Sequence, residues 1–267
     1  MSGVFDLKTR MAEMGIVPKK AFGQNFLVSP QVIGKIVAAV AAREFADLIE
    51  VGPGLGALTE PLLARQLQPR LIELDRDVVE YWRGRGLQVY DQDALKLDWQ
   101  ALMLKSPALL VSNLPYQIST HLVVDRCLGP ESLRYMVLMF QKEVAQRLMA
   151  QPRTKDYGFL SVMVQLHFNL TRVCDAAPGD FFPRPKVASR VLAFERKPGV
   201  QLGMPFLRFV KAAFLFRRKF LLKNLGSVVD KQHMPEVFAE LQLSSKARAE
   251  ELTPAQFVEL FQRLYEH

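Results

Sequence analysis

The chain has 267 residues, of which 49% are hydrophobic and 23% are charged. This length and composition allow a substantial core, which excludes a disordered or fibrous protein. No apolar run approaches the roughly 18–20 residues that a membrane-spanning helix needs, and the first residues lack a secretory signal, so we expect a cytoplasmic protein without a membrane partner.

The two cysteines, Cys127 and Cys174, stand far apart and form no CxxC motif, and the chain has four scattered histidines. This cysteine usage favours a reducing compartment and no structural zinc. We therefore expect no metal site.

The basic residues are concentrated in one part of the sequence. The segment from Phe181 to Lys223 holds eleven Lys and Arg residues against one acid, Glu195, although the whole chain carries a net charge of +8. A nearly neutral body with one strongly basic stretch is typical of a protein that binds a polyanion. The alternative is a solvated surface that is basic without a ligand.

Short apolar segments alternate with amphipathic ones from about residue 46. We predict strands at 46–51, 70–74, 87–90, 108–112 and 135–140, with helices at 58–67 and 78–83. This alternation indicates βαβ units and a parallel sheet. A further strand at 187–196 is expected at the edge of the sheet.

Only helices are expected after Lys197-Pro198-Gly199, at about 204–225, 235–241, 246–250 and 254–264. Ser244 or Ser245 and Thr253 are the N-cap candidates for the last two helices. We place the domain boundary near Pro198, which gives an α/β domain at 1–197 and a small all-α domain at 198–267. The fold class is therefore α/β of the Rossmann-like kind, with a helical C-terminal domain.

A glycine-rich turn, Gly52-Pro53-Gly54-Leu55-Gly56, joins the first predicted strand to the first helix. Glycines at this point allow a sharp turn and a close approach of the backbone to a ligand. Glu73 ends the second strand, where a carboxylate can accept both hydroxyls of a ribose. This geometry suits any adenosine-bearing cofactor, and Glu73 alone is also compatible with an ordinary surface carboxylate.

Two further acids favour S-adenosylmethionine over a dinucleotide. Glu50 directly precedes the glycines, where it would repel a pyrophosphate but would tolerate a sulfonium or an amino group. Asp93 follows the third strand, where it can accept a hydrogen bond from the adenine amino group. A helix N-cap is the competing role for Asp93.

The segment Asn113-Leu114-Pro115-Tyr116 follows the fourth strand, at the sheet edge where open α/β sheets bind ligands. It offers an amide oxygen, a backbone carbonyl and an aromatic face. Two acceptors and a stacking ring would hold an exocyclic amine such as adenine N6 and favour a pyramidal nitrogen with its lone pair free. The competing role is a simple turn that ends a strand.

A helix at 204–223 would place Arg208, Lys211, Arg218, Lys219 and Lys223 on one face and a row of apolar residues on the other. Such a basic stripe suits contact with phosphates, as do Arg184 and Lys186 next to it in the basic segment. Arg217 falls on the apolar side, so we expect it to have an acidic or carbonyl partner from the neighbouring domain. Phe181 and Phe182 either line the entrance of the site or pack in the core.

With these residues in place, the sequence resembles the ribosomal RNA adenine dimethyltransferases that act on small-subunit rRNA. The match is carried by Gly23 to Leu27, Glu50 to Gly56, Glu73-Leu74-Asp75, Asn113 to Tyr116, Phe182 to Val187, and Phe214 to Leu225. These segments follow the family order over almost the whole chain.

The resemblance implies that S-adenosylmethionine is the methyl donor, with S-adenosylhomocysteine as its product, and that it contacts Asn25, Leu27, Gly52, Gly54, Glu73, Asp93 and Asn113. It implies a catalytic segment of Asn113, Leu114, Pro115 and Tyr116, with Tyr116 stacked on the target adenine. It also implies two methyl transfers to each of two adjacent adenosines in the 3′-terminal hairpin of small-subunit rRNA. The implied partner is the small ribosomal subunit or its assembly precursor, and we expect a monomer.

The sequence departs from the family pattern at Gln117, where Asn is usual, and at Phe220, where a smaller or polar residue is common. Three other functions remain open at this point. They are an adenine methyltransferase of large-subunit rRNA that confers antibiotic resistance, an RNA-binding or assembly factor without catalysis, and a dehydrogenase. Leu114 favours the small-subunit group over the resistance enzymes, which usually carry Ile there.

Overall fold

The computed structural model describes residues 9–11, 25–200, 202–230 and 232–265. The chain forms two compact units. The α/β unit comprises Met1–Ala145 and Asn169–Arg196, and the helical unit comprises Gln146–Phe168 and Lys197–His267. The helical unit thus takes a segment from the middle of the chain in addition to the C-terminal residues that the sequence assigned to a separate domain. The division into domains at 1–197 and 198–267 stays a prediction.

The described strands form two sheets. A seven-stranded sheet has the order β4-β3-β2-β5-β6-β9-β7, and a two-stranded sheet pairs β1 with β8. The strands are β1 (Phe26–Leu27), β2 (Asp47–Val51), β3 (Arg70–Glu73), β4 (Val89–Asp91), β5 (Ala108–Ser112), β6 (Leu133–Gln141), β7 (Phe168–Ala176), β8 (Phe181–Phe182) and β9 (Ser189–Arg196). Strands β4, β3, β2, β5 and β6 are parallel to their neighbours, and β9 is antiparallel to β6.

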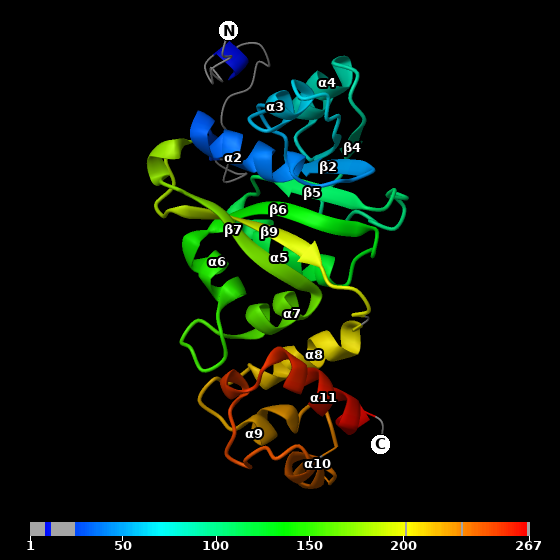
Figure 1. Ribbon diagram of the computed structural model, residues 1–267, viewed down its shortest axis with the longest axis vertical. Coiled ribbons are helices and arrows are strands. Elements are labelled where there is room, and N and C mark those ends of the chain that lie inside the picture. Colours follow the sequence, from blue (N-terminus) through cyan, green and yellow to red (C-terminus); the bar gives the residue numbers. More distant parts are fainter. Residues whose placement is uncertain (1–8, 12–24, 201, 231, 266–267) are drawn as a thin grey trace. The chain divides into compact units, whose positions relative to one another are not determined.

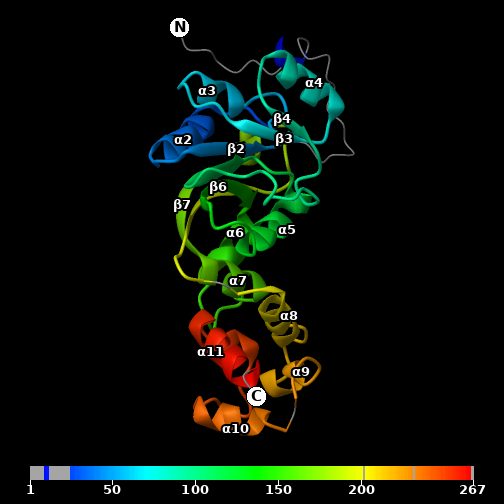
Figure 2. The same ribbon diagram turned by 90° about the vertical axis from the view of Figure 1, so that its right-hand side faces the viewer.

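Helices cover both faces of the large sheet (Figure 1). On one face lie α2 (Pro30–Ala41), α3 (Thr59–Leu63) and α4 (Arg76–Gly84), and on the other lies α5 (Tyr116–Cys127). Figure 2 shows the same layers from the side. Apolar side chains of α2 pack against the buried faces of β5 and β6 in one core cluster, which includes Ile36, Val40, Val111 and Val137. The strands read as nearly continuous apolar runs because both faces are covered.

The predicted βαβ pattern is confirmed, with one error in the position of a strand. The segment 187–196 was expected at the sheet edge, but β9 lies between β6 and β7. The edge is taken by β7, whose middle residues are exposed or half-buried and whose sequence had not been assigned to a strand. Polar residues such as Asn169, Thr171 and Arg172 are suited to an edge because they meet water.

The helical unit contains α7 (Phe159–His167), α8 (Met204–Ala213), α9 (Leu221–Leu225), α10 (Met234–Glu240), the 3₁₀ turn η3 (Ala249–Glu251) and α11 (Pro254–Tyr265). Helix α6 (Lys142–Met149) runs from the first unit into the second, and a second 3₁₀ turn, η2 (Pro178–Asp180), precedes β8. Phe206, Phe209 and Phe257 are fully buried in the helical unit. Phe206 and Phe209 pack around the ring of Phe261, at centroid distances of 5.2 and 5.4 Å.

The prediction of one continuous helix at 204–225 is wrong. Helix α8 ends at Ala213, and a turn separates it from α9. The cause is the buried amide of Asn224, which donates hydrogen bonds to the carbonyl oxygens of Ala213 and Phe216, at 2.7 and 3.1 Å. The amide supplies a donor to a carbonyl at the end of α8 that lacks an intrahelical partner, so the helix can stop there.

The last helix of the chain agrees better with its predicted position. Thr253 caps α11, because its hydroxyl accepts the backbone N–H of Gln256 and the Gln256 side chain accepts the backbone N–H of Thr253. The helix expected at 246–250 is only the short η3. None of the described helices is both long and apolar enough to span a bilayer.

Candidate functional site: a cofactor-sized cavity and an exposed basic surface

The glycine-rich turn follows β2 and has a backbone that only glycine adopts readily. Gly52, Gly54 and Gly56 have φ angles of +68°, +48° and +86°. A Cβ atom on Gly56 would lie 2.7 and 2.8 Å from two carbons of the Trp82 ring, so no side chain fits there. The indole N–H of Trp82 in turn donates to the carbonyl of Gly54, at 3.1 Å. Helix α4 therefore fixes the shape of the turn.

Glu50 lies at the base of the same turn and is almost completely buried. The hydroxyl of Thr59 donates to its carboxyl oxygen, at 2.8 Å. Burial raises the pKa of Glu50 to about 8, and the nearby charge of Glu73 adds to the rise, whereas the hydrogen bond from Thr59 opposes it. A carboxyl group held this way ionises readily when a cation is placed beside it.

Glu73 ends β3, and the backbone holds its carboxylate. One oxygen accepts the N–H groups of Leu74 and Asp75, at 2.7 and 3.0 Å. Burial raises the pKa of Glu73, although backbone hydrogen bonds from Asp75, Leu74 and Gly54 act in the opposite direction. Because a carboxylate has about four acceptor positions, the group retains capacity for the hydroxyls of a ligand.

Asp93 lies where either of its two predicted roles is possible. Its carboxylate accepts the backbone N–H of Leu95, at 2.9 Å, as a residue that starts a helical turn does. The same residue also lines the cavity described below. A local structural role and contact with a ligand are therefore compatible.

The segment Asn113–Tyr116 connects β5 to α5. The side-chain amide of Asn113 donates to the carbonyl of Asn25, at 3.3 Å, which leaves the amide oxygen as an acceptor. Leu114 is buried, and Pro115 directly precedes the first turn of α5. The segment is thus anchored to the backbone on the N-terminal side of α2.

Tyr116 begins α5, and its phenolic oxygen lies 2.6 Å from the hydroxyl oxygen of Ser189 on β9. Burial raises the pKa of Tyr116, and the contact with Ser189 opposes that rise. Ser189 itself is fully buried. The ring of Tyr116 is therefore held at its far end by a neighbouring strand, a contact for which the sequence offered no signal.

One cavity of about 300 Å³ collects these groups. Its lining includes every residue that the sequence or the resemblance assigned to the cofactor or to catalysis: Asn25, Leu27, Gly52, Gly54, Glu73, Asp93, Asn113, Leu114, Pro115 and Tyr116. The lining also includes residues outside the motifs, among them Ile72, Gln92, Ala94 and Ile118. Each of these four lies within two positions of a motif residue in the sequence, which is the signal that could have found them. Gly23 and Gln24 lie outside the described residues.

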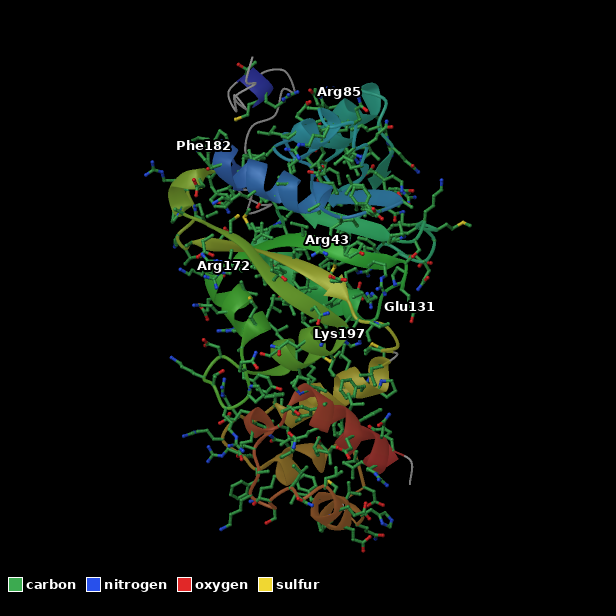
Figure 3. The ribbon with its side chains drawn as sticks, in the orientation of Figure 1. Arg43, Arg85, Glu131, Arg172, Phe182 and Lys197 are labelled. Carbon is green, nitrogen blue, oxygen red and sulfur yellow. The ribbon has the colours of Figure 1, made fainter. Side chains whose placement is uncertain are left out.

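The two phenylalanines of the basic segment have different environments. Phe181 is buried and packs in the core with α2, whereas Phe182 is 50% exposed. Figure 3 shows Phe182 close to the turn that precedes β9. Of the two roles considered for this pair, core packing therefore applies to Phe181, and the entrance role stays a prediction for Phe182.

All seven cations that the sequence assigned to RNA are exposed, but they do not share one helix. Arg184 and Lys186 belong to the α/β unit, between β8 and β9. The others are distributed over the helical unit: Arg208 and Lys211 on α8, Arg218 and Lys219 in the turn after it, and Lys223 on α9. The prediction of a single basic stripe on one helix is wrong, because α8 ends at Ala213. The cations of the helical unit therefore lie on two helices and the turn between them.

Arg217 has acidic and carbonyl partners, as predicted, but they lie in its own unit rather than in a neighbouring domain. Its guanidinium donates to the carboxylate of Glu250, at 3.2 Å, and to the carbonyl oxygens of Thr154 and Lys155. The side chain is nevertheless 49% exposed rather than buried. Among the described residues, no group of three or more His, Cys, Asp or Glu side chains could hold a metal ion.

Residues 17–266 match the family model "Ribosomal RNA adenine dimethylase". The chain belongs to this family. A relative from Bdellovibrio bacteriovorus, named Ribosomal RNA small subunit methyltransferase A, is 49% identical over 96% of this chain and 95% of its own length. A protein of the same name from Syntrophotalea carbinolica is 40% identical over 94% of this chain and 98% of its own length.

Two solved structures share the fold of this dimethylase family member. A dimethyladenosine transferase from Plasmodium falciparum superposes with a TM-score of 0.77 at 24% identity, over 90% of this chain and 98% of the other. The 23S rRNA methyltransferase ErmE superposes with a TM-score of 0.62 at 24% identity, over 90% of this chain and all of the other. The Rossmann-like methyltransferase fold predicted from the sequence is confirmed.

Proposed function

We propose that this protein transfers methyl groups from S-adenosylmethionine to N6 of two adjacent adenosines in the 3′-terminal hairpin of small-subunit (16S) rRNA. The product is N6,N6-dimethyladenosine. The observation that carries this proposal is the cavity that joins the glycine turn, the acids at the strand ends and Asn113–Tyr116. The names of the relatives that are 49% and 40% identical over nearly the whole chain support it.

The cavity fits S-adenosylmethionine in the chemistry of its donors and acceptors. Glu73 is suited to the ribose hydroxyls and Asp93 to the adenine amino group, while Asn25, Leu27, Gly52, Gly54 and Asn113 would complete the contacts. When bound, this cofactor supplies a methyl group made electrophilic by its sulfonium. Ionised Glu50 would balance that positive charge inside a buried site.

The target adenine would meet the segment Asn113–Tyr116. Its N6 lone pair is normally delocalised into the ring, which makes the nitrogen a poor nucleophile. The Asn113 amide oxygen and the Leu114 carbonyl would accept the two N6 protons and favour a pyramidal nitrogen whose lone pair is available. The Tyr116 ring, held at its hydroxyl by Ser189, would stack on the base after it leaves the RNA stack.

The exposed cations of each unit would contact the RNA. Arg184, Lys186, Arg208, Lys211, Arg218, Lys219 and Lys223 would contact phosphates, which gives affinity without reading sequence. The small ribosomal subunit or its assembly precursor, in the cytoplasm, is the partner that this proposal implies. We further propose that the protein acts as a monomer.

The test is transfer of labelled methyl from S-adenosylmethionine to small and large subunits isolated from a methylation-deficient host. We expect label only in small-subunit RNA, recovered as N6,N6-dimethyladenosine. The Asn113→Ala enzyme should transfer methyl about 10²–10³-fold more slowly, because it lacks an acceptor for the N6 protons. Label in large-subunit RNA would assign the protein to the other methyltransferase group, and RNA binding without transfer would contradict the catalytic proposal.

A further inference from the structure

The turn between α8 and α9 exposes two large apolar side chains. Leu215 is 61% exposed and Phe216 is 49% exposed, although the same unit buries Phe206, Phe209 and Phe257 completely. Removing a side chain such as Phe from water stabilises a fold. The exposed ring of Phe216, in a unit that buries those three rings completely, therefore points to a ligand.

The exposure of Phe216 does not result from a loosely held backbone. The buried amide of Asn224 donates to the carbonyl of Phe216, at 3.1 Å, and the N–H of Lys219 donates to the same carbonyl, at 2.9 Å. The next residue, Arg217, is tied to Glu250 and to the carbonyls of Thr154 and Lys155. The ring is thus carried by a turn that is anchored on both sides.

The surroundings of the ring are strongly basic. The ammonium group of Lys219 lies 4.1 Å from the centroid of the Phe216 ring, and Arg218 and Lys223 are exposed nearby in the chain. An apolar protein surface docked here would have to desolvate these cations without compensation. A nucleic acid offers phosphates to the cations and a flat base to the ring, which is the combination that proteins use to bind single strands.

We propose that Phe216 is a stacking platform for an unpaired base of the RNA substrate, with Lys219 and Arg218 on the adjoining phosphates. The inference rests on the proposed function in one respect only, which is that the partner is RNA. It adds a base contact in the helical unit to a surface that otherwise binds phosphates. The turn then recognises a single-stranded loop or bulge rather than a regular duplex.

The experiment separates base contacts from phosphate contacts. The full-length chain is titrated by fluorescence anisotropy with a labelled single-stranded RNA of about eight nucleotides and with an abasic strand of the same length and charge. Both titrations use a Tyr116→Ala background, so that the ring in the cavity does not contribute. We expect the strand with bases to bind about tenfold more tightly than the abasic strand.

Replacing Phe216 with Ala should abolish this preference and leave the affinity for the abasic strand unchanged. Phe216→Tyr should retain the preference, which shows that the fold tolerates a change at this position. The matched control is Leu215→Ala, which removes the neighbouring exposed apolar side chain and should have no effect on the preference. If Phe216→Ala kept the preference for bases, the proposal would be wrong.

Two further outcomes would also decide the matter. Sedimentation of a dimer that Phe216→Ala converts to a monomer would overturn the proposal, because the ring would then be covered by a second copy of the chain. Absence of methyl transfer by the parent chain would refute the proposed function alone, since the base preference is measured without turnover. A preference that requires an aromatic residue at position 216 supports the base-stacking proposal whether or not the parent chain transfers methyl groups.

Discussion

The cavity of the α/β unit and the basic turn of the helical unit hold their polar groups in different ways. In the cavity, the carboxylates of Glu50 and Glu73 are fixed by a hydroxyl and by backbone N–H groups. In the turn, Arg218 and Lys219 are exposed to water. Fixed acceptors suit a small ligand of one shape and a reaction that demands precise placement, whereas solvated cations suit a polyanion. The two regions should therefore respond differently to substitution.

The largest effect is expected from Gly56→Ala, which damages the cavity. The new Cβ would clash with Trp82 at a residue whose φ is +86°, so we expect the free energy of unfolding to fall by roughly 2–5 kcal/mol. Binding of S-adenosylmethionine should weaken in parallel. The control is Gly34→Ala on α2, where nothing lies within 4 Å of the added atom and helix propensity improves. Equal denaturant midpoints for the two variants would contradict the account.

The double variant Arg218→Gln/Lys219→Gln should affect RNA binding alone. We expect RNA affinity to fall about tenfold and the slope of log K against log salt to decrease by about 1–2, with the melting temperature unchanged. Arg217→Ala is the matched control, because Arg217 is bound to Glu250 and to two carbonyls. That variant should lose about 1 kcal/mol of stability and keep its affinity for RNA. If Arg217→Ala weakened RNA binding while the double variant lowered the melting temperature, the roles assigned to these neighbouring residues would be contradicted.

Ser189→Ala tests how the ring of Tyr116 is positioned. Loss of the hydroxyl 2.6 Å from the phenol should lower the rate at saturating substrate about fivefold and leave KM for RNA unchanged. Tyr116→Phe removes the same hydrogen bond from the other side. The two substitutions together should therefore be no worse than either alone. A further loss of rate from Ser189→Ala in the Tyr116→Phe background would indicate another role for Ser189.

A separate prediction is a pH dependence of stability that arises from Glu50. Burial raises its pKa from 4.5 to about 8 in the folded chain, so the folded state holds a proton that the unfolded state has released. Stability should therefore decrease as pH rises from about 4.5 to about 8, by on the order of 1 kcal/mol per unit.

Glu50→Gln should remove that slope, because its amide does not titrate while its oxygen still accepts from Thr59. The measurement is the melting temperature of the ligand-free protein between pH 5 and pH 8. The difference between variant and parent should increase toward pH 8. A difference that does not change with pH would mean that Glu50 is ionised in the folded protein.

Most of the cavity could be predicted from the sequence because its residues belong to strand ends. Parallel strands place their carboxyl ends at one edge of a sheet, so Glu50, Glu73, Asp93 and Asn113 had to lie near one another once the strands were recognised. Ser189 could not be found this way. It lies 73 residues from Tyr116 in sequence and reaches it only through the pairing of β9 with β6.

The helical unit was harder to predict for a related reason. Periodicity favoured one helix through residues 204–225, but Asn224 contacts the Ala213 carbonyl and stabilises a break that the apolar pattern does not contain. The edge strand β7 was missed because its sequence mixes apolar and polar residues without strict alternation. A buried polar group that needs a hydrogen-bond partner can override the local helix or strand propensity of the sequence.

The most direct test of the division between the two regions is methyl transfer in a single turnover, with enzyme in excess over small subunits. The Arg218→Gln/Lys219→Gln variant should reach the rate of the parent at saturation but require about tenfold more enzyme. For Asn113→Ala, the rate of methyl transfer should reach its plateau at the same enzyme concentration as for the parent. The plateau rate itself should remain low. If the basic variant reached only a low plateau, or if Asn113→Ala recovered the full rate at high concentration, the account would be contradicted.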